Sequence, residues 1–152
     1  MSNSELRAPD LRARPPRSPR VKLGGYVLLP RFLDKGRATV AEQNGEYHYA
    51  CPLDQHFINY AGIDPDGLKS ELAAGKGDSE ILAWIQENAK NRHEPWEIAQ
   101  WSVYQEARVP GDPETREYFN DMHKGASELG EDITTWFDLL DLDDHVTFGG
   151  KA

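Results

Sequence analysis

The chain has 152 residues and a mass of 17.2 kDa, a size typical of one globular domain around one hydrophobic core. Its 38% hydrophobic content excludes wholesale disorder, and the lack of any run of about 18 uncharged apolar residues excludes a membrane-spanning helix. A net charge of −9 makes nucleic acid an unlikely partner. The first residues contain no apolar signal segment, and the single Cys51 forms no internal disulfide. We therefore expect a soluble, cytoplasmic protein.

Charge is distributed unevenly along the chain. Residues 7 to 22 carry six basic side chains against Asp10 alone, so this segment has a charge of +5 and the remainder −14. An acidic run without Lys or Arg lies near the other end, at Glu131, Asp132, Asp138, Asp141, Asp143 and Asp144. Because opposite charges attract, we predict that the basic segment docks on its own domain, preferably on the part of the acidic run around Asp138, Asp141, Asp143 and Asp144. The alternative is that both segments are solvated and only keep the protein soluble.

The N-terminal segment is predicted to be an extended arm. Residues 14 to 20 contain three prolines, which remove amide donors and force extended geometry on the residues before them. We therefore divide the chain into an arm over residues 1–20 and a single domain over residues 21–152. The apolar residues just after the arm are expected to anchor it to the core: Val21, Leu23, Tyr26 and Val27.

A helix is predicted to follow from Pro30, which is tolerated at the first helical position. Leu29, Leu33 and Val40 lie on one face of this helix, and Asn44-Gly45 can end it in a left-handed turn. Asn-Gly is also a strong hairpin signal, but the residues before it do not alternate cleanly, so the helix is favoured over a hairpin.

The rest of the chain contains the start signals of several successive helices, as expected for a helical bundle. Asp64, Asp78 and Asp112 are candidate helix caps, and Pro95 begins a further helix. Apolar residues recur at helical spacing after each of these positions and again over residues 133 to 140. The apolar stripe over residues 96 to 107 is the widest, so we expect this helix to pack centrally. About six helices with short links predict an all-α fold, a compact single-domain bundle.

Four segments resemble a known family. They read DLRARPPRSPRVKLGGY (residues 10–26), LPRFLDKGRA (29–38), GEYHYACPLDQ (45–55) and WFDLLDLDD (136–144). These segments are similar to a family of small bacterial proteins, the domain of unknown function numbered 5069. The resemblance covers nearly the whole chain. It implies a stand-alone bacterial domain and carries no activity that transfers residue by residue.

Residues 47 to 56 contain several polar side chains of the types that bind metals or act in catalysis. His48, Cys51, Asp54 and His56 are residue types that ligate zinc, but their spacing matches no closed zinc motif, so neither a metal nor another cofactor is expected. Cys51 with a histidine base is a second, nucleophilic interpretation. The favoured interpretation is structural, with Cys51 in the core beside two tyrosines and Asp54 as the cap of a short helix.

The first predicted helix crowds Arg31, Asp34, Lys35 and Arg37 on its polar side. The simple interpretation is a local ion-pair face on this helix. The alternative is a ligand pocket for a small anion, lined by Arg31, Asp34 and Lys35 with His48, Cys51 and Asp54 opposite.

Two function classes remain open. We favour a non-catalytic binding or interaction module with a small ligand or a protein partner, because no catalytic signature is present and no membrane association is expected. The alternative is a small enzyme or ligand-binding protein built around the anion pocket. Convergence of the candidate side chains on one cavity favours the alternative, whereas side chains on different solvent faces favour an interaction module.

Overall fold

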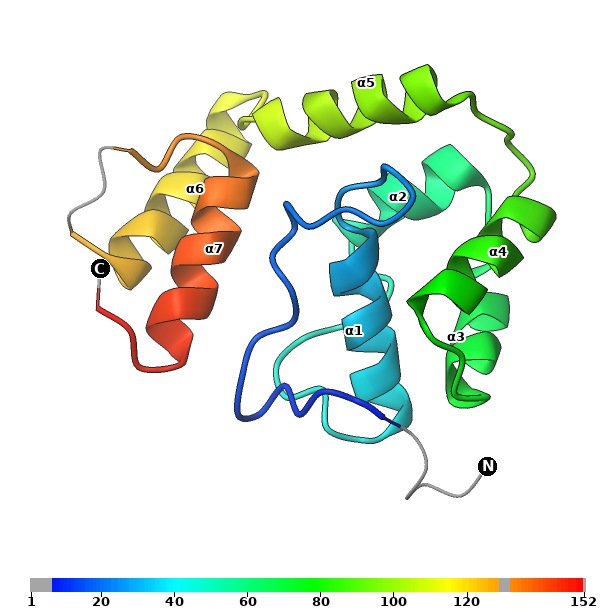
Figure 1. Cartoon of the computed structure of the whole chain (residues 1–152). Coiled ribbons are helices and arrows are strands. Elements are labelled where there is room, and N and C mark those ends of the chain that lie inside the picture. The colour runs from blue at the N-terminus through cyan, green and yellow to red at the C-terminus, as the bar shows by residue number, and fades with distance from the viewer. Residues whose placement is uncertain (1–6, 129–131, 152) are drawn as a thin grey trace.

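A computed structural model describes residues 7–128 and 132–151, and within these residues the chain is helical, without a β-strand (Figure 1). The helices are α1 (Leu29–Val40), α2 (Asp54–Ala61), α3 (Pro65–Ala73), α4 (Asp78–Asn88), α5 (Pro95–Ala107), α6 (Pro113–Ala126) and α7 (Trp136–Thr147). The predicted all-α fold is confirmed, with seven helices in the described part of the chain where about six were expected. None of these helices has the length and apolar character needed to cross a membrane.

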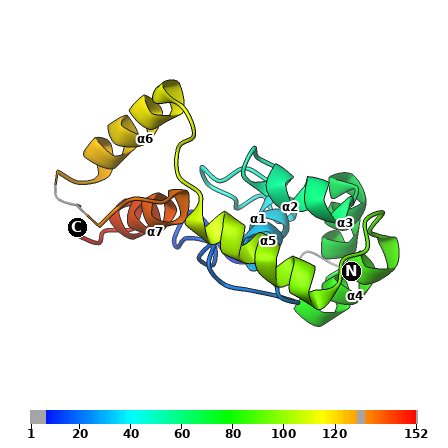
Figure 2. The same cartoon turned by 90° about the horizontal axis from the view of Figure 1, so that it is seen from above.

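α1 lies in the middle of the molecule. In Figure 1 the α3–α4 pair lies on one side of α1 and the α6–α7 pair on the other. α5 bridges the two sides, and the view from above in Figure 2 shows it running across α1 and α2. Every residue of α1 from Leu29 to Gly36 is buried, on all faces of the helix. A helix buried all round needs partners for its polar residues as well as its apolar ones.

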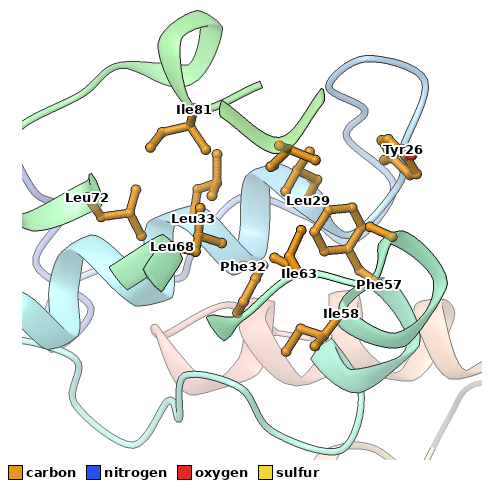
Figure 3. Packing of buried hydrophobic residues seen from close by; sticks show 12 residues of the cluster. Tyr26, Leu29, Phe32, Leu33, Phe57, Ile58, Ile63, Leu68, Leu72 and Ile81 are labelled. Atoms are coloured by element: carbon orange, nitrogen blue, oxygen red, sulfur yellow. The ribbon is translucent and has the colours of Figure 1, made fainter. Parts of the chain in front are cut away.

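The main core surrounds the apolar face of α1 (Figure 3). Phe32 stacks on Tyr49 with ring centroids 4.6 Å apart, and Tyr26 packs edge-on against Phe57 at 5.1 Å. A smaller cluster ties α7 to the start of α1 through Val27, Leu28 and Phe137. The buried members of the main core are Tyr26, Leu29, Phe32, Leu33, Phe57, Ile58, Ala61, Ile63, Leu68, Leu72, Ile81 and Ile85.

Gly36 allows α1 and α3 to approach closely. A methyl group at this position would overlap the Leu72 side chain and crowd the Tyr49 ring. We expect Gly36→Ala to lower the free energy of unfolding by about 1–3 kcal/mol, because added volume in a packed contact strains it. Gly125→Ala in α6 is the matched control, since a methyl group there meets nothing within 4 Å and alanine favours the helix. Urea unfolding of both variants tests the contact, and equal stability of the two would contradict it.

Several helix starts agree with the sequence. Asp64 caps α3 by accepting from two backbone amides, Asp112 caps α6 by accepting from Thr115, and Pro95 begins α5. The predicted cap at Asp78 is wrong by one position. Gly77 is the N-cap of α4, and the Asp78 carboxylate instead binds arginines from other parts of the chain.

The end of α1 also differs from the prediction. The helix ends at Val40, and the left-handed residue after it is Glu42. The Gln43 amide donates to the Ala38 carbonyl, which closes the helix end before Asn44-Gly45 is reached. Gly45 is left-handed for another reason, because its backbone lies against the Leu11 carbonyl and leaves no room for a side chain.

The prediction that the helix over residues 96 to 107 packs centrally is wrong. Trp96, Val103 and Tyr104 of α5 are 68%, 55% and 64% exposed, whereas Ser102 and Gln105 are buried. The Ser102 hydroxyl donates to the Gly25 carbonyl at 2.6 Å and accepts from the Val27 amide at 3.1 Å. These bonds provide partners for backbone groups of the preceding loop. α5 thus turns Ser102 and Gln105 inward beside Ile98 and Trp101, which pack on the core, and leaves the rest of its apolar stripe in solvent.

The described part of the arm, residues 7–20, packs on the helices. Leu11, Pro16 and Pro19 are buried, and the Leu28 amide donates to the Pro19 carbonyl at 2.9 Å. Val21 is exposed, so the expectation that it anchors the arm is wrong, whereas Tyr26 and Val27 are buried as expected.

The predicted docking on the acidic run is confirmed for one arginine. Arg20 binds Asp138 and Asp141 of α7, and Ser18 donates to Asp141 at 2.8 Å. Arg17 binds outside the acidic run, on α1 and α4. It donates to Asp34 of α1 at 3.0 Å and to Asp78 of α4 at 2.8 Å. Glu131 of the acidic run lies outside the described residues.

Candidate functional site

A buried cluster of Lys35, Cys51 and Asp54 joins α1 to the start of α2. The Lys35 Nζ atom lies 2.7 Å from Asp54 Oδ2 and donates to Cys51 Sγ at 3.4 Å. The Cys51 amide donates to the same Asp54 oxygen at 3.3 Å. Lys35 is 3% exposed and Asp54 is fully buried. Asp54 therefore does not cap α2 through its side chain, as the structural interpretation expected, because its carboxylate is used by Lys35 and Cys51.

The second α1 cation, Arg31, forms a similar pair with α7. Arg31 Nη1 donates to Asp144 Oδ2 at 2.7 Å, and Nη2 donates to Oδ1 at 3.3 Å. The Tyr47 hydroxyl also donates to Asp144, at 2.7 Å, and burial together with this bond raises the pKa of Tyr47. The local ion-pair face predicted for α1 is thus wrong for Arg31 and Lys35. Arg31 and Lys35 pair across the molecule, and only Asp34 and Arg37 approach each other within the helix, at 3.8 Å.

These clusters lie beside one cavity of about 700 Å³ between α1, the segment of residues 45–53 and α7. Arg31, Lys35, His48 and Cys51 line it, and Asp54 lies behind them against Lys35. Four of the six candidate residues therefore converge on one cavity, and a fifth supports two of them. The remaining wall is largely apolar or aromatic: Leu11, Leu53, Leu140, Tyr47, Tyr118 and Phe148.

Asp34 does not belong to this cavity. It lies on another face of α1, where Arg17 donates to it through both side-chain and backbone nitrogens. A second hollow, of about 960 Å³, opens there between the arm, α1 and the α3–α4 link. Arg17 and Arg37 both bind Asp78 at its wall. Burial alone would raise the pKa of Asp78, but these two hydrogen bonds outweigh it and hold the pKa below its usual value.

Two carboxylates at the first cavity have no ion-pair partner among the described residues. Glu46 and Asp143 line the cavity and take part in none of the salt bridges found in that part of the chain. Burial raises the pKa of Asp143, and the neighbouring Asp144 carboxylate raises it further, although Arg31 opposes them. The electrostatic environment of Asp143 is therefore net negative.

Sequence reasoning did not place Glu46, Asp143 or Asp144 at this site. The two aspartates were assigned only to docking of the arm. A usable signal existed, because Asp144 follows Phe137 by seven residues and Leu140 by four, which places it on the apolar face of the helix, and a buried carboxylate needs a cation. Nothing comparable in the sequence indicates Tyr118 or Phe148.

Histidine, cysteine and carboxylate side chains do not form a metal-binding group in the described ranges. No three of them lie close enough together to hold an ion there. His56 is half-buried on α2 and lies 3.4 Å from Gln105 of α5 instead of facing His48. Burial, with a smaller contribution from Arg108, lowers the pKa of His56.

A family model matches residues 13–146, which is most of the chain and includes every residue of the Lys35 and Arg31 clusters. The model describes a domain of unknown function, DUF5069. The chain belongs to the DUF5069 family. The resemblance seen in the sequence is therefore confirmed, and the family match begins inside the arm of this DUF5069 domain, at residue 13. A comparison with curated proteins finds no significant match.

Proposed function

We propose that this chain is a ligand-binding protein, the alternative that convergence on one cavity favours, and that its ligand is a small organic amine held in the 700 Å³ cavity. The observation that supports this most directly is the convergence of Arg31, Lys35, His48 and Cys51 on that cavity, beside two unpaired carboxylates. A cavity of this size with a mostly apolar wall and a few polar groups is typical of small-molecule sites. A free, half-buried thiol suits the reducing cytoplasm, which is the location included in this proposal.

The charge of the ligand follows from which groups are already paired. Arg31 is neutralised by Asp144 and Lys35 by Asp54, so neither offers the free positive charge that an anion needs. Arg12, the third cation at the wall, is exposed and binds Asp10. Glu46 and Asp143 are the groups left to bind a ligand, and both are negative. An ammonium group between them forms charge-assisted hydrogen bonds, whereas a carboxylate or phosphate is repelled.

The body of the ligand is expected to be apolar or aromatic. Tyr118, Phe148, Leu53 and Leu140 line the same cavity as Asp143. Ring faces attract cations and also pack well against other rings. An arylalkylamine fits both halves of this wall.

Two probes with the same aromatic body and opposite charge test the proposal. We expect phenylethylamine to shift the NMR signals of the backbone amides of His48, Cys51 and Thr147, while phenylpropionate at the same concentration leaves them in place. Binding of the carboxylate in preference to the amine would instead support an anion pocket. Shifts confined to residues outside the cavity, or no shifts with either probe, would contradict the proposal.

Amine binding is expected to weaken on acidification at a higher pH than it would with an ordinary aspartate. Burial, followed by the charge of Asp144, raises the pKa of Asp143 above the usual 3.8. The protonated acid no longer attracts an ammonium ion, so affinity falls as the pH drops through this raised value. Titrations at a series of pH values check the effect. Asp143→Asn should remove that step, and an unchanged step in this variant would assign it to another group.

A second candidate function is self-association through α5. Its exposed stripe alternates large and small side chains. An antiparallel pairing of two copies can be centred between Gln100 and Val103. This pairing sets Trp96 against Ala107 of the partner subunit and Tyr104 against Ala99 of the partner subunit. This two-fold arrangement fills each small position with a large side chain from the other copy. The acidic residues that would flank the pairing, Glu97 and Glu106, already contact His93 and Lys22 of their own chain.

Sedimentation velocity over a range of concentrations tests this candidate. We expect a dimer that Val103→Glu abolishes, because the new charge would be buried in the pairing. Gln86→Glu places the same charge on the exposed face of α4 and should leave the dimer intact. A wild-type protein that stays monomeric at all concentrations would rule out this use of α5.

A further inference from the structure

Cys51 and Lys35 lie against each other at the wall of the cavity, where a small oxidant can reach the sulfur. Cys51 is the one thiol of the sequence and is half-buried, and its Sγ atom lies 3.4 Å from Lys35 Nζ. Asp54 fixes both partners, since its Oδ2 atom contacts Lys35 Nζ and accepts from the Cys51 amide. The other oxygen, Asp54 Oδ1, is fully buried and has no hydrogen-bond partner among the described residues.

We propose that Cys51 and Lys35 form a peroxide-responsive modification site, in which oxidation joins the two side chains by a covalent sulfur–nitrogen bond. In the first step the thiol attacks a peroxide oxygen and gives a sulfenic acid and water, so sulfur loses two electrons and the peroxide gains them. In the second step the Lys35 amine attacks this sulfur, the S–O bond breaks, and a sulfenamide and a second water form.

The cluster supplies what the second step needs. Lys35 must give up its ammonium proton and a further proton when it bonds to sulfur. One goes to the departing hydroxyl, which leaves as water, and the other goes to the Asp54 carboxylate. The unpartnered Oδ1 atom gives the resulting carboxylic acid an oxygen that no other group occupies. The fixed positions of the amine and the thiol make their reaction effectively intramolecular and favour it over attack by thiols in solution.

This reaction also replaces two buried charges by a neutral acid and a neutral sulfenamide. Lys35 and Asp54 are almost completely removed from solvent, where charges are costly. The environment that holds the ion pair is thus equally suited to the uncharged product. The cross-link does not depend on the amine ligand proposed above, because it needs only the two side chains and a peroxide.

Intact-mass and peptide mass spectrometry of the full chain after treatment with hydrogen peroxide test this site. We expect most molecules to lose the mass of two hydrogen atoms, a cross-linked peptide containing Cys51 and Lys35, and recovery of the original mass with dithiothreitol. A gain of whole oxygen atoms without a cross-link, or a disulfide-linked dimer, would overturn the proposal.

Three variants locate the bond. Cys51→Ser should show no mass loss. Lys35→Arg keeps the charge but removes the amine nucleophile, so it should gain oxygen without losing hydrogen. Lys76→Arg, on the link between α3 and α4, is the matched control and should cross-link as the wild type does. If Lys35→Arg does not fold, the peptide map of the wild-type protein still decides. A cross-link from any lysine other than Lys35 would refute the assignment.

Discussion

Asp54→Ala is expected to destabilise the domain by about 3–5 kcal/mol, the typical cost of leaving the partner of a buried ion pair uncompensated. Lys35 would then remain 3% exposed with Cys51 Sγ as its nearest polar contact. The Cys51 amide would also lose its acceptor. Urea unfolding followed by circular dichroism measures the loss, and a domain of ordinary stability would retain little margin.

The double variant Lys35→Met, Asp54→Leu replaces both charges and so tests whether the loss in Asp54→Ala comes from leaving Lys35 as an unpaired buried charge. Hydrophobic side chains of similar size often replace a buried pair at no cost, so we expect the double variant to be clearly more stable than Asp54→Ala alone. Asp66→Ala is the control for a first-turn aspartate, because Asp66 is exposed in α3. It should change stability by no more than about 0.5 kcal/mol. If Asp54→Ala is as mild as this control, Lys35 and Asp54 do not form a buried pair.

Deletion of residues 1–20 is expected to lower stability by at least about 3 kcal/mol, since truncating one buried leucine alone costs about 2–5 kcal/mol. The deletion removes Leu11, which is 1% exposed, and the arginine that joins α1 to α4 through Asp34 and Asp78. It also removes the contact of Arg20 with α7. Thermal melts at low and high salt measure the effect. The loss should be smaller at high salt, because exposed pairs are screened while the burial of Leu11 is not.

Two point variants test single arginines of the arm without shortening it. Arg17→Ala should destabilise the domain because it leaves Asp34, which is 8% exposed, with only a distant contact to Arg37. Arg14→Ala removes an exposed arginine of the same arm and should have almost no effect. Equal melting temperatures for the deletion and the intact chain would show that the arm does not dock.

Local features of this fold were predictable from the sequence. Asp64 and Asp112 are followed by proline, and both signals act within three residues of the cap, so a short window contains all the information. The end of α1 was mispredicted because its closing bonds involve Glu42 and Gln43, which carry no turn preference, whereas Asn44-Gly45 does. Gly45 is needed because the Leu11 carbonyl lies against its backbone, and Leu11 is distant in the chain, so local sequence does not reveal this contact.

The site was predictable only in part. Arg31, Lys35, His48 and Cys51 were predictable as members of one candidate pocket because their side chains are of types that bind ligands. The partner of Arg31 is 113 residues away, so local spacing suggested an ion-pair face on α1 where the fold instead supplies Asp144. The same limit explains α5. Its wide apolar stripe indicated a central helix, but Ser102 faces inward to bind Gly25 and Val27, a contact over more than 70 residues.

Isothermal titration of phenylethylamine into the wild-type protein and the Asp143→Asn variant measures the ligand preference of the cavity most directly. The structure predicts binding to the wild type, about tenfold weaker binding to Asp143→Asn because a charge-assisted hydrogen bond is lost, and unchanged binding to Glu87→Gln, an exposed carboxylate of α4 away from the cavity. The opposite result, no heat of binding to the wild type or equal affinity in all three proteins, would contradict an amine site at Asp143.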